Sequence, residues 1–476
     1  MDRRHFLHTG ALAAAALPQI GRAQARRPNL VFLLADQWRA SAFGHTGDPN
    51  VRTPHLDRLA GQSVRFANAV SCCPVCTPYR AALLTGRFPT STGMFLNDLY
   101  LPDRERCLGE VFQAAGYDTA YIGKWHLDGH GRSSYIPPAR RQGFAWWQAA
   151  ECDHHYPRSH YYTGDSPEMR HWEGYDAFAQ TAAAQQYLRD HTRGPRPFVL
   201  CVSYGTPHFP HHTAPADYQA LYPSEQLKLA ANVPASRAVA ARRELVGYYA
   251  HCTALDKCVG DVLTTLDQTG LAEQTILVFT SDHGEMMGAH DVAPLQKQWP
   301  YDEAVHIPFL LRAPGAPAKV VTTPLNVTDV LPTLLGLTGV AVPPSVEGQD
   351  LAALVTGAGD GPDRAALIMS VSPFTAGLRE YRGIRTNRYS YVRDLQGPWL
   401  CFDNAADPLQ QRNLVGEPAQ ATLVRDLEAR LQAELRKIGD EFRPRQHYLD
   451  RWGYQVARHG SISYEPDAKV QSPAAR

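Results

Sequence analysis

Two pairs of polar residues follow apolar runs of the chain, at positions where side chains could bind a metal ion. Asp36-Gln37 and Asp282-His283 each come after a continuous run rich in aliphatic and β-branched residues, which is typical of a buried strand. The carboxyl ends of parallel strands meet at one edge of a sheet, so both pairs could supply oxygen and nitrogen ligands to one ion. Each pair alone is weak evidence, because aspartate after a strand more often caps a helix or forms a turn.

A cysteine with an unusual set of neighbours lies between these pairs. Residues 75–94 read VCTPYRAALLTGRFPTSTGM, which places Cys76, Pro78 and Arg80 at alternate positions before Leu-Thr-Gly-Arg at 84–87. A single cysteine is normally a small buried hydrophobic residue, and Cys-x-Pro-x-Arg alone occurs by chance in many chains. The whole string is far more specific, and it favours a chemical role for Cys76.

This segment resembles the formylglycine-dependent (type I) sulfatases of the alkaline phosphatase-like superfamily, whose core is Cys-x-Pro-x-Arg followed by Leu-Thr-Gly-Arg. The resemblance extends from Pro28 to about Leu435, with pieces in matching order. These pieces are Thr53–Asp57, Gly123–His126, Pro207-His208, Thr280–Glu285, Lys297 with Tyr301–Glu303, Asp329–Leu335, Asp407-Pro408 and Asn413-Leu414. The resemblance implies an enzyme that hydrolyses a sulfate ester.

The resemblance also implies that Cys76 is not itself the nucleophile. A formylglycine-generating maturation enzyme would oxidise it to an aldehyde, 3-oxoalanine, which hydrates to a geminal diol. One hydroxyl then attacks sulfur and the alcohol leaves, after which deprotonation of the second hydroxyl releases sulfate and restores the aldehyde. Tyr79 stands where most members have serine, which puts the efficiency of maturation in question.

A calcium ion is the implied cofactor, because Ca²⁺ prefers oxygen ligands and can hold a nucleophile and a sulfate oxygen together. Its expected ligands are Asp36, Gln37, Asp282 and His283, beside the modified Cys76. Zinc is the alternative, because a histidine and two aspartates could also bind it. Many relatives carry a second aspartate in place of Gln37, so this site has one fewer negative charge.

Five further residues in the matched pieces have implied catalytic roles. Arg80 and Lys124 would place positive charge near the diol and the sulfate. His126 would deprotonate the second hydroxyl, while His208 and Lys297 would face the bridging oxygen, with His208 as the proton donor to the leaving alcohol. Outside this context, each would be read as an ordinary surface lysine or arginine or a hydrogen-bonded histidine.

Two other functions are considered beside the sulfatase. A phosphonate monoester or phosphodiester hydrolase of the same superfamily shares the formylglycine, and some members resemble this chain in having Asp-Gln after the first strand. That branch has tyrosine and threonine where Lys124 and His126 stand, so these two residues favour sulfate. The other alternative is a non-catalytic anion-binding protein in which Cys76 is never oxidised.

The segment from Phe144 to Asp176 is rich in aromatic and basic residues, which suits a substrate of sugar rings bearing anionic groups. We therefore predict a saccharide sulfate ester as substrate. The alternative is an insertion whose rings pack on the core. The residues are Trp146, Trp147, His154, His155, Tyr156, Arg158, His160, Tyr161, Tyr162, Arg170 and Trp172.

Alternating strands and helices must position these residues, and they predict an α/β fold with a large, mostly parallel sheet sandwiched by helices. Expected strands are 29–35, 198–202 and 275–280, and expected helices are 244–266 and 327–337, the latter capped by Thr328 or Asp329. From residue 366 the pattern changes to a hairpin over 381–393 and 399–403, followed by a helix carrying Val424, Leu427, Leu431 and Leu435. We therefore expect a catalytic sulfatase domain over 26–365 and a smaller C-terminal α+β subdomain over 366–476.

Residues 1–25 have the pattern of a twin-arginine signal peptide. Arg3-Arg4 precedes the short apolar run 10–18, and Ala23-Gln24-Ala25 fits a cleavage site. The alternative is a basic N-terminus ahead of an ordinary helix. We expect export to the periplasm or beyond, with no membrane anchor, because the apolar run is too short to span a bilayer.

The charge balance and the cysteines limit the possible partners. Lysine plus arginine and aspartate plus glutamate each number 47, so there is no excess positive charge to hold nucleic acid. The nine cysteines lack the spacing of a disulfide framework or a structural zinc site, and their pairing is left open.

Overall fold

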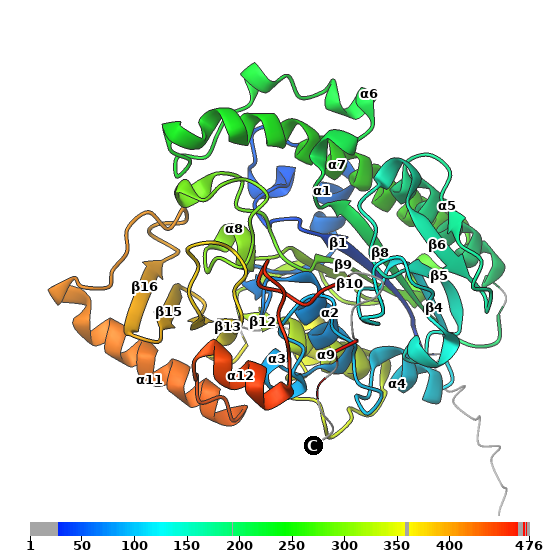
Figure 1. The fold of residues 1–476 in the computed structure, drawn as a ribbon. Helices are drawn as coiled ribbons and strands as arrows, with labels where there is room; N and C mark the ends of the chain where they lie inside the picture. Colours follow the sequence, from blue (N-terminus) through cyan, green and yellow to red (C-terminus); the bar gives the residue numbers. More distant parts are fainter. Residues whose placement is uncertain (1–26, 193, 358–360, 465–469, 472, 474–476) are drawn as a thin grey trace, which may run out of the picture.

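The computed structural model describes residues 27–192, 194–357, 361–464, 470–471 and 473. The predicted signal peptide, residues 1–25, lies outside them. A ten-stranded sheet runs through the larger part of the molecule with helices on both faces, and a four-stranded sheet with a long helix lies beside it (Figure 1). The predicted fold class is confirmed.

The large sheet brings the ends of its central strands to one edge. Its strands are β1 (Asn29–Asp36), β2 (Val64–Phe66), β4 (Asp118–Lys124), β5 (Trp146–Ala150), β6 (His160–Thr163), β7 (Arg170–His171), β8 (Phe198–Pro207), β9 (Thr275–Ser281), β10 (Phe309–Arg312) and β11 (Lys319–Val321). They are arranged β11-β2-β10-β9-β1-β8-β4-β5-β6-β7. The five strands from β9 to β5 are parallel. Ala35 of β1 pairs with Ser281 of β9, so the residues that follow them, Asp36 and Asp282, lie side by side.

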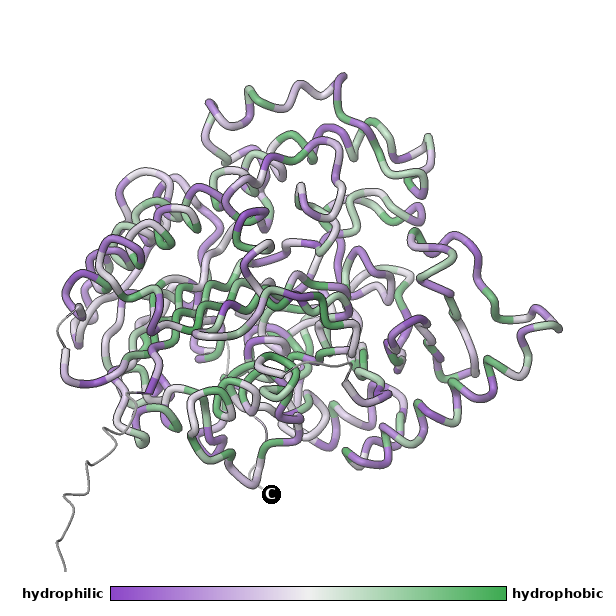
Figure 2. Tube along the Cα trace, turned by 180° about the vertical axis from the view of Figure 1, so that it is seen from behind, coloured by the Kyte–Doolittle hydropathy of each residue, from purple (hydrophilic) through white to green (hydrophobic). Residues whose placement is uncertain are grey.

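Strand β1 is buried on both faces, as its continuous apolar sequence predicts. Val31 and Leu33 pack with helices α1 (Pro54–Gly61), α5 (Asp176–Asp190) and α7 (Ala235–Gln268). Phe32 and Leu34 pack on the opposite face with α2 (Cys76–Thr85), α4 (Leu108–Ala114) and α9 (Val327–Thr338). Burying one such side chain contributes about 1.5–3 kcal/mol. Apolar residues accordingly concentrate along the strands at the centre of the trace (Figure 2).

The start of α9 differs from the sequence prediction. The cap is Asn326, because the helix begins at Val327 and the expected caps, Thr328 and Asp329, already lie in its first turn. Asp329 contributes to the cap from the first turn of the helix, because its carboxylate accepts a hydrogen bond from the backbone N–H of Asn326 at 2.8 Å. The two residues form a capping box. The predicted helix over 244–266 is the central part of the longer α7.

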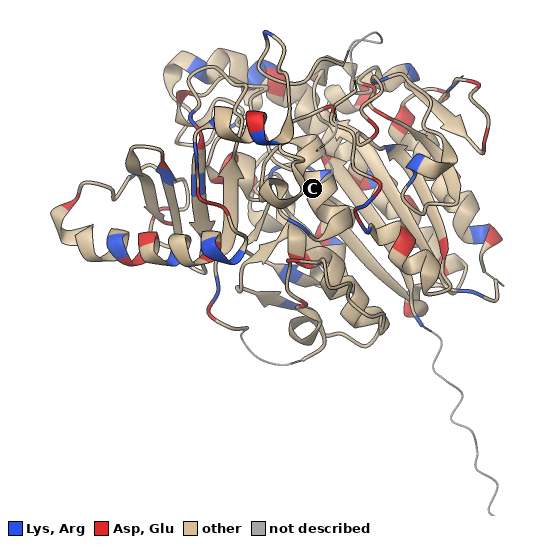
Figure 3. Cartoon of the chain, turned by 60° about the horizontal axis from the view of Figure 1, so that its bottom comes forward, with Lys and Arg blue, Asp and Glu red and all other residues tan. Residues whose placement is uncertain are grey.

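The C-terminal part begins with β13 (Ala366–Ser370), followed by β14 (Tyr381–Arg385), β15 (Tyr389–Asp394) and β16 (Gly397–Asp403), which form an antiparallel sheet in this order. Helix α11 (Ala421–Lys437) packs on this sheet through Leu427, Leu431 and Leu435. Basic and acidic residues alternate along the exposed side of α11 (Figure 3). The remaining elements are β3 (Ala69–Val70), β12 (Leu325–Asn326), α3 (Pro89–Thr92), α6 (Ala216–Gln219), α8 (Asp302–Val305), α10 (Ala352–Thr356) and α12 (Arg445–Trp452).

Two further properties bear on the sequence predictions. Within the described ranges, no helix is both long enough and apolar enough to cross a bilayer. All nine cysteines fall in these ranges, and every one of them is buried with a free thiol. Disulfides therefore make no contribution to this fold.

Candidate active site

Cys76 occupies the first turn of α2 and is buried at the centre of a polar cluster. Its sulfur lies 3.3 Å from Lys297 Nζ, 3.4 Å from His283 Nε2 and 3.7 Å from Asp36 Oδ1. Burial and the Asp36 charge raise the pKa of the thiol, but Lys124, Lys297 and His283 outweigh them and hold it well below its usual range. The helix N-terminus adds partial positive charge at this position. The site thus favours an anionic group at residue 76.

Four of the predicted metal ligands converge on one point. Asp36, Cys76, Asp282 and His283 each offer a ligand atom, these atoms lie within 4.8 Å of one another, and all four residues are buried. Burial, with the charge of the neighbouring Asp36, raises the pKa of Asp282 to about 6. A cation would offset this repulsion, and the two carboxylates with one imidazole suit a divalent ion.

Gln37 reaches the same cluster with its amide group held in a defined orientation. Its Oε1 accepts a hydrogen bond from Lys297 Nζ at 3.3 Å, and its Nε2 donates to Glu285. Glu285 also accepts the backbone N–H groups of Met287 and Leu295, at 3.1 and 2.8 Å. The amide nitrogen is therefore turned toward Glu285 and the amide oxygen toward the site.

Arg80 connects helix α2 to the ends of three strands. Its Nη2 lies 3.2 Å from one carboxylate oxygen of Asp36 and 3.2 Å from one of Asp282, while its Nη1 donates to the Lys124 carbonyl at 2.9 Å and to Ser203 Oγ at 2.6 Å. Lys124 Nζ binds the same Asp36 oxygen at 2.6 Å. Burial raises the pKa of Asp36, but Lys124, His208, Arg80 and His283 together hold it well below the ordinary value. Arg80 therefore holds both carboxylates and Lys124 holds that of Asp36, and both cations face the cluster.

His126 lies near Cys76 and pairs with Asp98. Its Nε2 is 3.0 Å from Asp98 Oδ1, and Nδ1 is buried with no hydrogen-bond partner in the described structure. Burial lowers the pKa of the ring, but Cys152 and Asp98 raise it, to about 9. A cation bound in the acidic cluster would add positive charge nearby and disfavour the imidazolium form.

His208, which directly follows β8, does not have the hydrogen bonds expected of a proton donor to the site. Its Nδ1–H donates to the Phe209 carbonyl at 2.7 Å, so its Nε2 is left to accept from Lys297 Nζ at 3.1 Å. Burial and the Lys297 charge hold the pKa of His208 well below its usual range. In this arrangement Lys297 carries the protons that face the site, and the neutral His208 orients it.

The structure adds residues that contact the predicted site residues and that the sequence did not assign to the catalytic site. Asp98 binds His126, Ser203 binds Arg80, and Glu285 holds the Gln37 amide. His154 stacks on His208 with ring centroids 4.3 Å apart. Only Glu285 belongs to a matched sequence piece, and the others come from separate loops and strands whose proximity depends on the fold.

The aromatic segment 144–176 mostly packs inside the protein. Trp147 and Tyr156 are fully buried, and Tyr161 stacks on Trp172 with centroids 3.9 Å apart. The packing alternative holds for these rings, which do not present a sugar platform. Tyr79 is also fully buried and belongs to the hydrophobic core.

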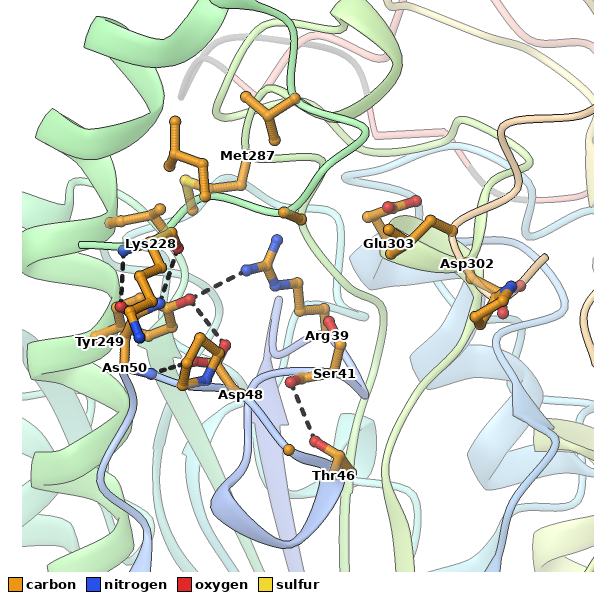
Figure 4. Close-up of a pocket in the computed structure, with 18 of the residues that line it drawn as sticks. Arg39, Ser41, Thr46, Asp48, Asn50, Lys228, Tyr249, Met287, Asp302 and Glu303 are labelled. Atoms are coloured by element: carbon orange, nitrogen blue, oxygen red, sulfur yellow. Dashed lines mark hydrogen bonds between the residues drawn. The ribbon is translucent and has the colours of Figure 1, made fainter.

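A separate cavity of about 260 Å³ opens beyond the end of β1. Arg39 extends into it, with Nη2 at 3.4 Å from the Tyr249 hydroxyl, which in turn donates to Asp48 at 2.8 Å (Figure 4). Glu303 and Lys228 also line this cavity, but no predicted catalytic or metal-binding residue does. The predicted site residues around Cys76 therefore lie outside this cavity.

The fold and the buried acid, histidine and cysteine cluster define a hydrolase of the alkaline phosphatase-like superfamily. Residues 28–340 match the Sulfatase family model, and residues 290–437 match the model of the N-sulphoglucosamine sulphohydrolase C-terminal region. The chain belongs to the sulfatase family and is a sulfuric ester hydrolase.

Named relatives agree with this assignment. The chain is 51% identical to an ulvan-active sulfatase of Formosa agariphila, over 94% of this chain and 89% of that protein. It is 30% identical to an endo-4-O-sulfatase of Bacteroides thetaiotaomicron, over 90% and 96%. A solved structure of the YidJ protein of Bacteroides fragilis superposes with a TM-score of 0.81 at 30% identity, over 92% of this chain and all of that one.

Proposed function

We propose that this sulfatase acts on a sulfated saccharide, with a hydrated formylglycine made from Cys76 as nucleophile and Ca²⁺ as cofactor. The observation that carries the proposal is the position of the Cys76 sulfur, within 3.3–3.7 Å of Lys297, His283 and Asp36. A buried cysteine usually packs against apolar side chains. Cys76 is instead surrounded by charged and polar groups, which do not suit a structural thiol. The same set suits a hydroxyl nucleophile next to a cation.

The calcium proposal depends on the donor atoms. Asp36, Asp282 and the amide oxygen of Gln37 provide oxygen, His283 provides one nitrogen, and the group derived from Cys76 completes the set. Oxygen donors in the majority fit a hard cation better than zinc, which usually takes four ligands of nitrogen and sulfur type. The ion would supply electrostatic stabilisation of the sulfate oxygens and of the nucleophile.

The remaining residues divide the work of proton transfer and positioning. Lys297, oriented by His208 at 3.1 Å, would donate a proton to the bridging oxygen as the alcohol leaves. Arg80 and Lys124 fix Asp36 and Asp282 and add positive charge around the sulfate. His126 would remove the proton from the second hydroxyl so that sulfate is released.

The names of relatives support the substrate class. One is named as active on ulvan and another as an endo-4-O-sulfatase, and the chain matches both along nearly its whole length. We propose a sulfated polysaccharide or oligosaccharide, reached after export through the twin-arginine signal at Arg3-Arg4. Maturation would require a formylglycine-generating enzyme that accepts the sequence Cys-Thr-Pro-Tyr-Arg at 76–80.

The test is a tryptic mass spectrum of the exported protein combined with turnover. The peptide containing Cys76 should carry formylglycine, and the protein should release sulfate from sulfated oligosaccharides in preference to hydrolysing a phosphonate monoester. Cys76→Ala provides the inactive control. An unmodified cysteine in protein that still turns over sulfate esters would refute the mechanism, and faster phosphonate hydrolysis would reassign the substrate class.

A further inference from the structure

Asp98 and His126 face each other beside the nucleophile, and both have left-handed backbone conformations. Their φ angles are 63° and 61°, a region that costs a residue other than glycine about 1–3 kcal/mol. Such strain persists only where other contacts hold it, and it concentrates at functional sites. Here the contact is the hydrogen bond of 3.0 Å between His126 Nε2 and Asp98 Oδ1.

The carboxylate of Asp98 has no oxygen free for a substrate. Arg132 binds both oxygens, with Nε at 2.9 Å from Oδ1 and Nη2 at 3.0 Å from Oδ2, and Asp98 is only 4% exposed. The guanidinium of Arg132 is itself covered by the ring of Tyr464, 4.0 Å from its centroid. Tyr464 comes from the C-terminal segment that follows the matched region ending at residue 437. The Asp98 carboxylate is thus held between Arg132 and His126.

A second connection links the Asp98 backbone to the nucleophile helix. The N–H of Asp98 lies 3.3 Å from Thr77 Oγ1, and this hydroxyl donates to the His126 carbonyl at 3.0 Å. Thr77 directly follows Cys76. The distances between the nucleophile, His126 and Asp98 are therefore fixed through the main chain as well as through side chains.

We propose that Asp98 is the positioning residue for His126, which it holds with Nε2–H toward its carboxylate so that Nδ1 is the nitrogen left for the group at position 76. The buried Nδ1 finds no other partner among the described residues. A carboxylate that fixes the tautomer and ring orientation of a catalytic histidine acts in the same way in Ser-His-Asp hydrolases. This inference rests on the proposed function, because it assumes that His126 is the base.

A buried ion pair can also be purely structural, so the experiment needs a matched control. Asp128 provides it, because it lies two residues after His126, is 1% exposed and binds Arg140 Nε at 3.0 Å. It has no contact with His126. Asp98→Asn and Asp128→Asn therefore each remove one buried carboxylate charge that is paired with an arginine, and only the first changes the partner of His126.

The test compares these two variants with the wild type in steady-state sulfate release from a sulfated oligosaccharide. Asp98→Asn should lower kcat about 10- to 1000-fold, as part of the roughly 10²- to 10⁴-fold that general base catalysis supplies, with KM changed less than about threefold. Formylglycine content, measured by mass spectrometry, should equal that of the wild type. Asp128→Asn should retain kcat within about twofold even if its melting temperature falls.

A second measurement does not depend on activity. In protein labelled with ¹⁵N-histidine and held at a pH above 9, where the ring is neutral, the His126 signal, assigned through His126→Gln, should show the Nε2–H tautomer in the wild type and in Asp128→Asn. In Asp98→Asn the tautomer preference should be lost. An unchanged tautomer, or an equal loss of kcat in both variants, would overturn the positioning role. If the wild type releases no sulfate, the proposed function fails, and the tautomer measurement still decides whether Asp98 orients His126.

Discussion

Lys297 Nζ lies 3.3 Å from the Cys76 sulfur and 3.1 Å from His208 Nε2. One ammonium group therefore contacts both the nucleophile position and a histidine that has no proton on the nitrogen facing it. This relationship supports the proposal that Lys297 donates the proton to the leaving alcohol, with His208 as its orienting partner.

Lys297→Ala should reduce kcat in a way that depends on the leaving group. General acid catalysis contributes about 10²- to 10⁴-fold, and it matters most when the leaving alcohol is a poor leaving group. The loss should therefore be larger for a saccharide sulfate than for 4-nitrophenyl sulfate, measured as kcat for each. Lys257→Ala, on the exposed side of α7, serves as the control and should match the wild type. An equal loss on both substrates would exclude proton donation by Lys297.

Removal of metal should lower both activity and stability. Burial and the neighbouring Asp36 charge raise the pKa of Asp282, so a divalent cation bound between the two carboxylates should stabilise the folded state. A ligand that binds only the folded state stabilises it by about 2.7 kcal/mol at 100 times its Kd. Treatment with EDTA should therefore lower the melting temperature and stop turnover, and added Ca²⁺ should restore both. Recovery with Zn²⁺ but not with Ca²⁺ would favour the other metal.

Gln37→Glu should destabilise the site although glutamate has the same shape. The amide nitrogen of Gln37 donates to Glu285, and a carboxylate there would leave Glu285 without its donor and facing a like charge. Loss of such a buried partner costs about 1–3 kcal/mol, measurable by thermal unfolding in EDTA. Gln62→Glu, on the exposed surface, is the control. Equal melting temperatures for Gln37→Glu and the wild type would show that the orientation of the amide is not fixed as described.

Gly123→Ala should disrupt the end of β4 and the position of the residue that follows, Lys124. Gly123 has φ 94°, and an added Cβ would lie 2.1 Å from the Ser203 carbonyl oxygen in the neighbouring strand. Separation of β4 from β8 would displace Lys124 and the Arg80 contacts, at a cost of about 2–4 kcal/mol. Gly116→Ala separates the cost of a positive φ from the cost of the Cβ clash. Gly116 has a similar φ of 87° but no atom within 4 Å of the added Cβ. It should lose only about 1 kcal/mol and retain its activity.

Asp176→Asn should change how stability depends on pH. Burial raises the pKa of Asp176 to about 7, and Asp153 adds to the effect. Because this value lies above the unfolded value of about 3.9, the contribution to stability is present at low pH and is lost as the pH rises through about 7. The asparagine variant should therefore gain melting temperature relative to the wild type between pH 4 and pH 8. A difference from the wild type that stays constant with pH in Asp176→Asn would contradict the raised pKa.

Much of the site could be predicted because its residues lie within short stretches of sequence. The apolar runs before Asp36 and Asp282 predict strands, and parallel strands bring their carboxyl ends to one edge, which is where both residues lie. The string around Cys76 is specific enough to indicate its chemistry without a structure. The cap of α9 was wrongly placed, because the helix boundary depends on Asn326 lying in a bridge with β3.

The sequence alone determined the family, the α/β fold and the residues around the nucleophile, because each of these depends on local pattern or on a contiguous motif. The tertiary structure decided which nitrogen of His208 is free, which way the Gln37 amide points, and which residue orients His126. These properties depend on Phe209, Glu285 and Asp98, whose hydrogen bonds form only after loops far apart in the chain have packed together. Hydrogen-bond geometry at that level has no periodicity or spacing in the sequence that could reveal it.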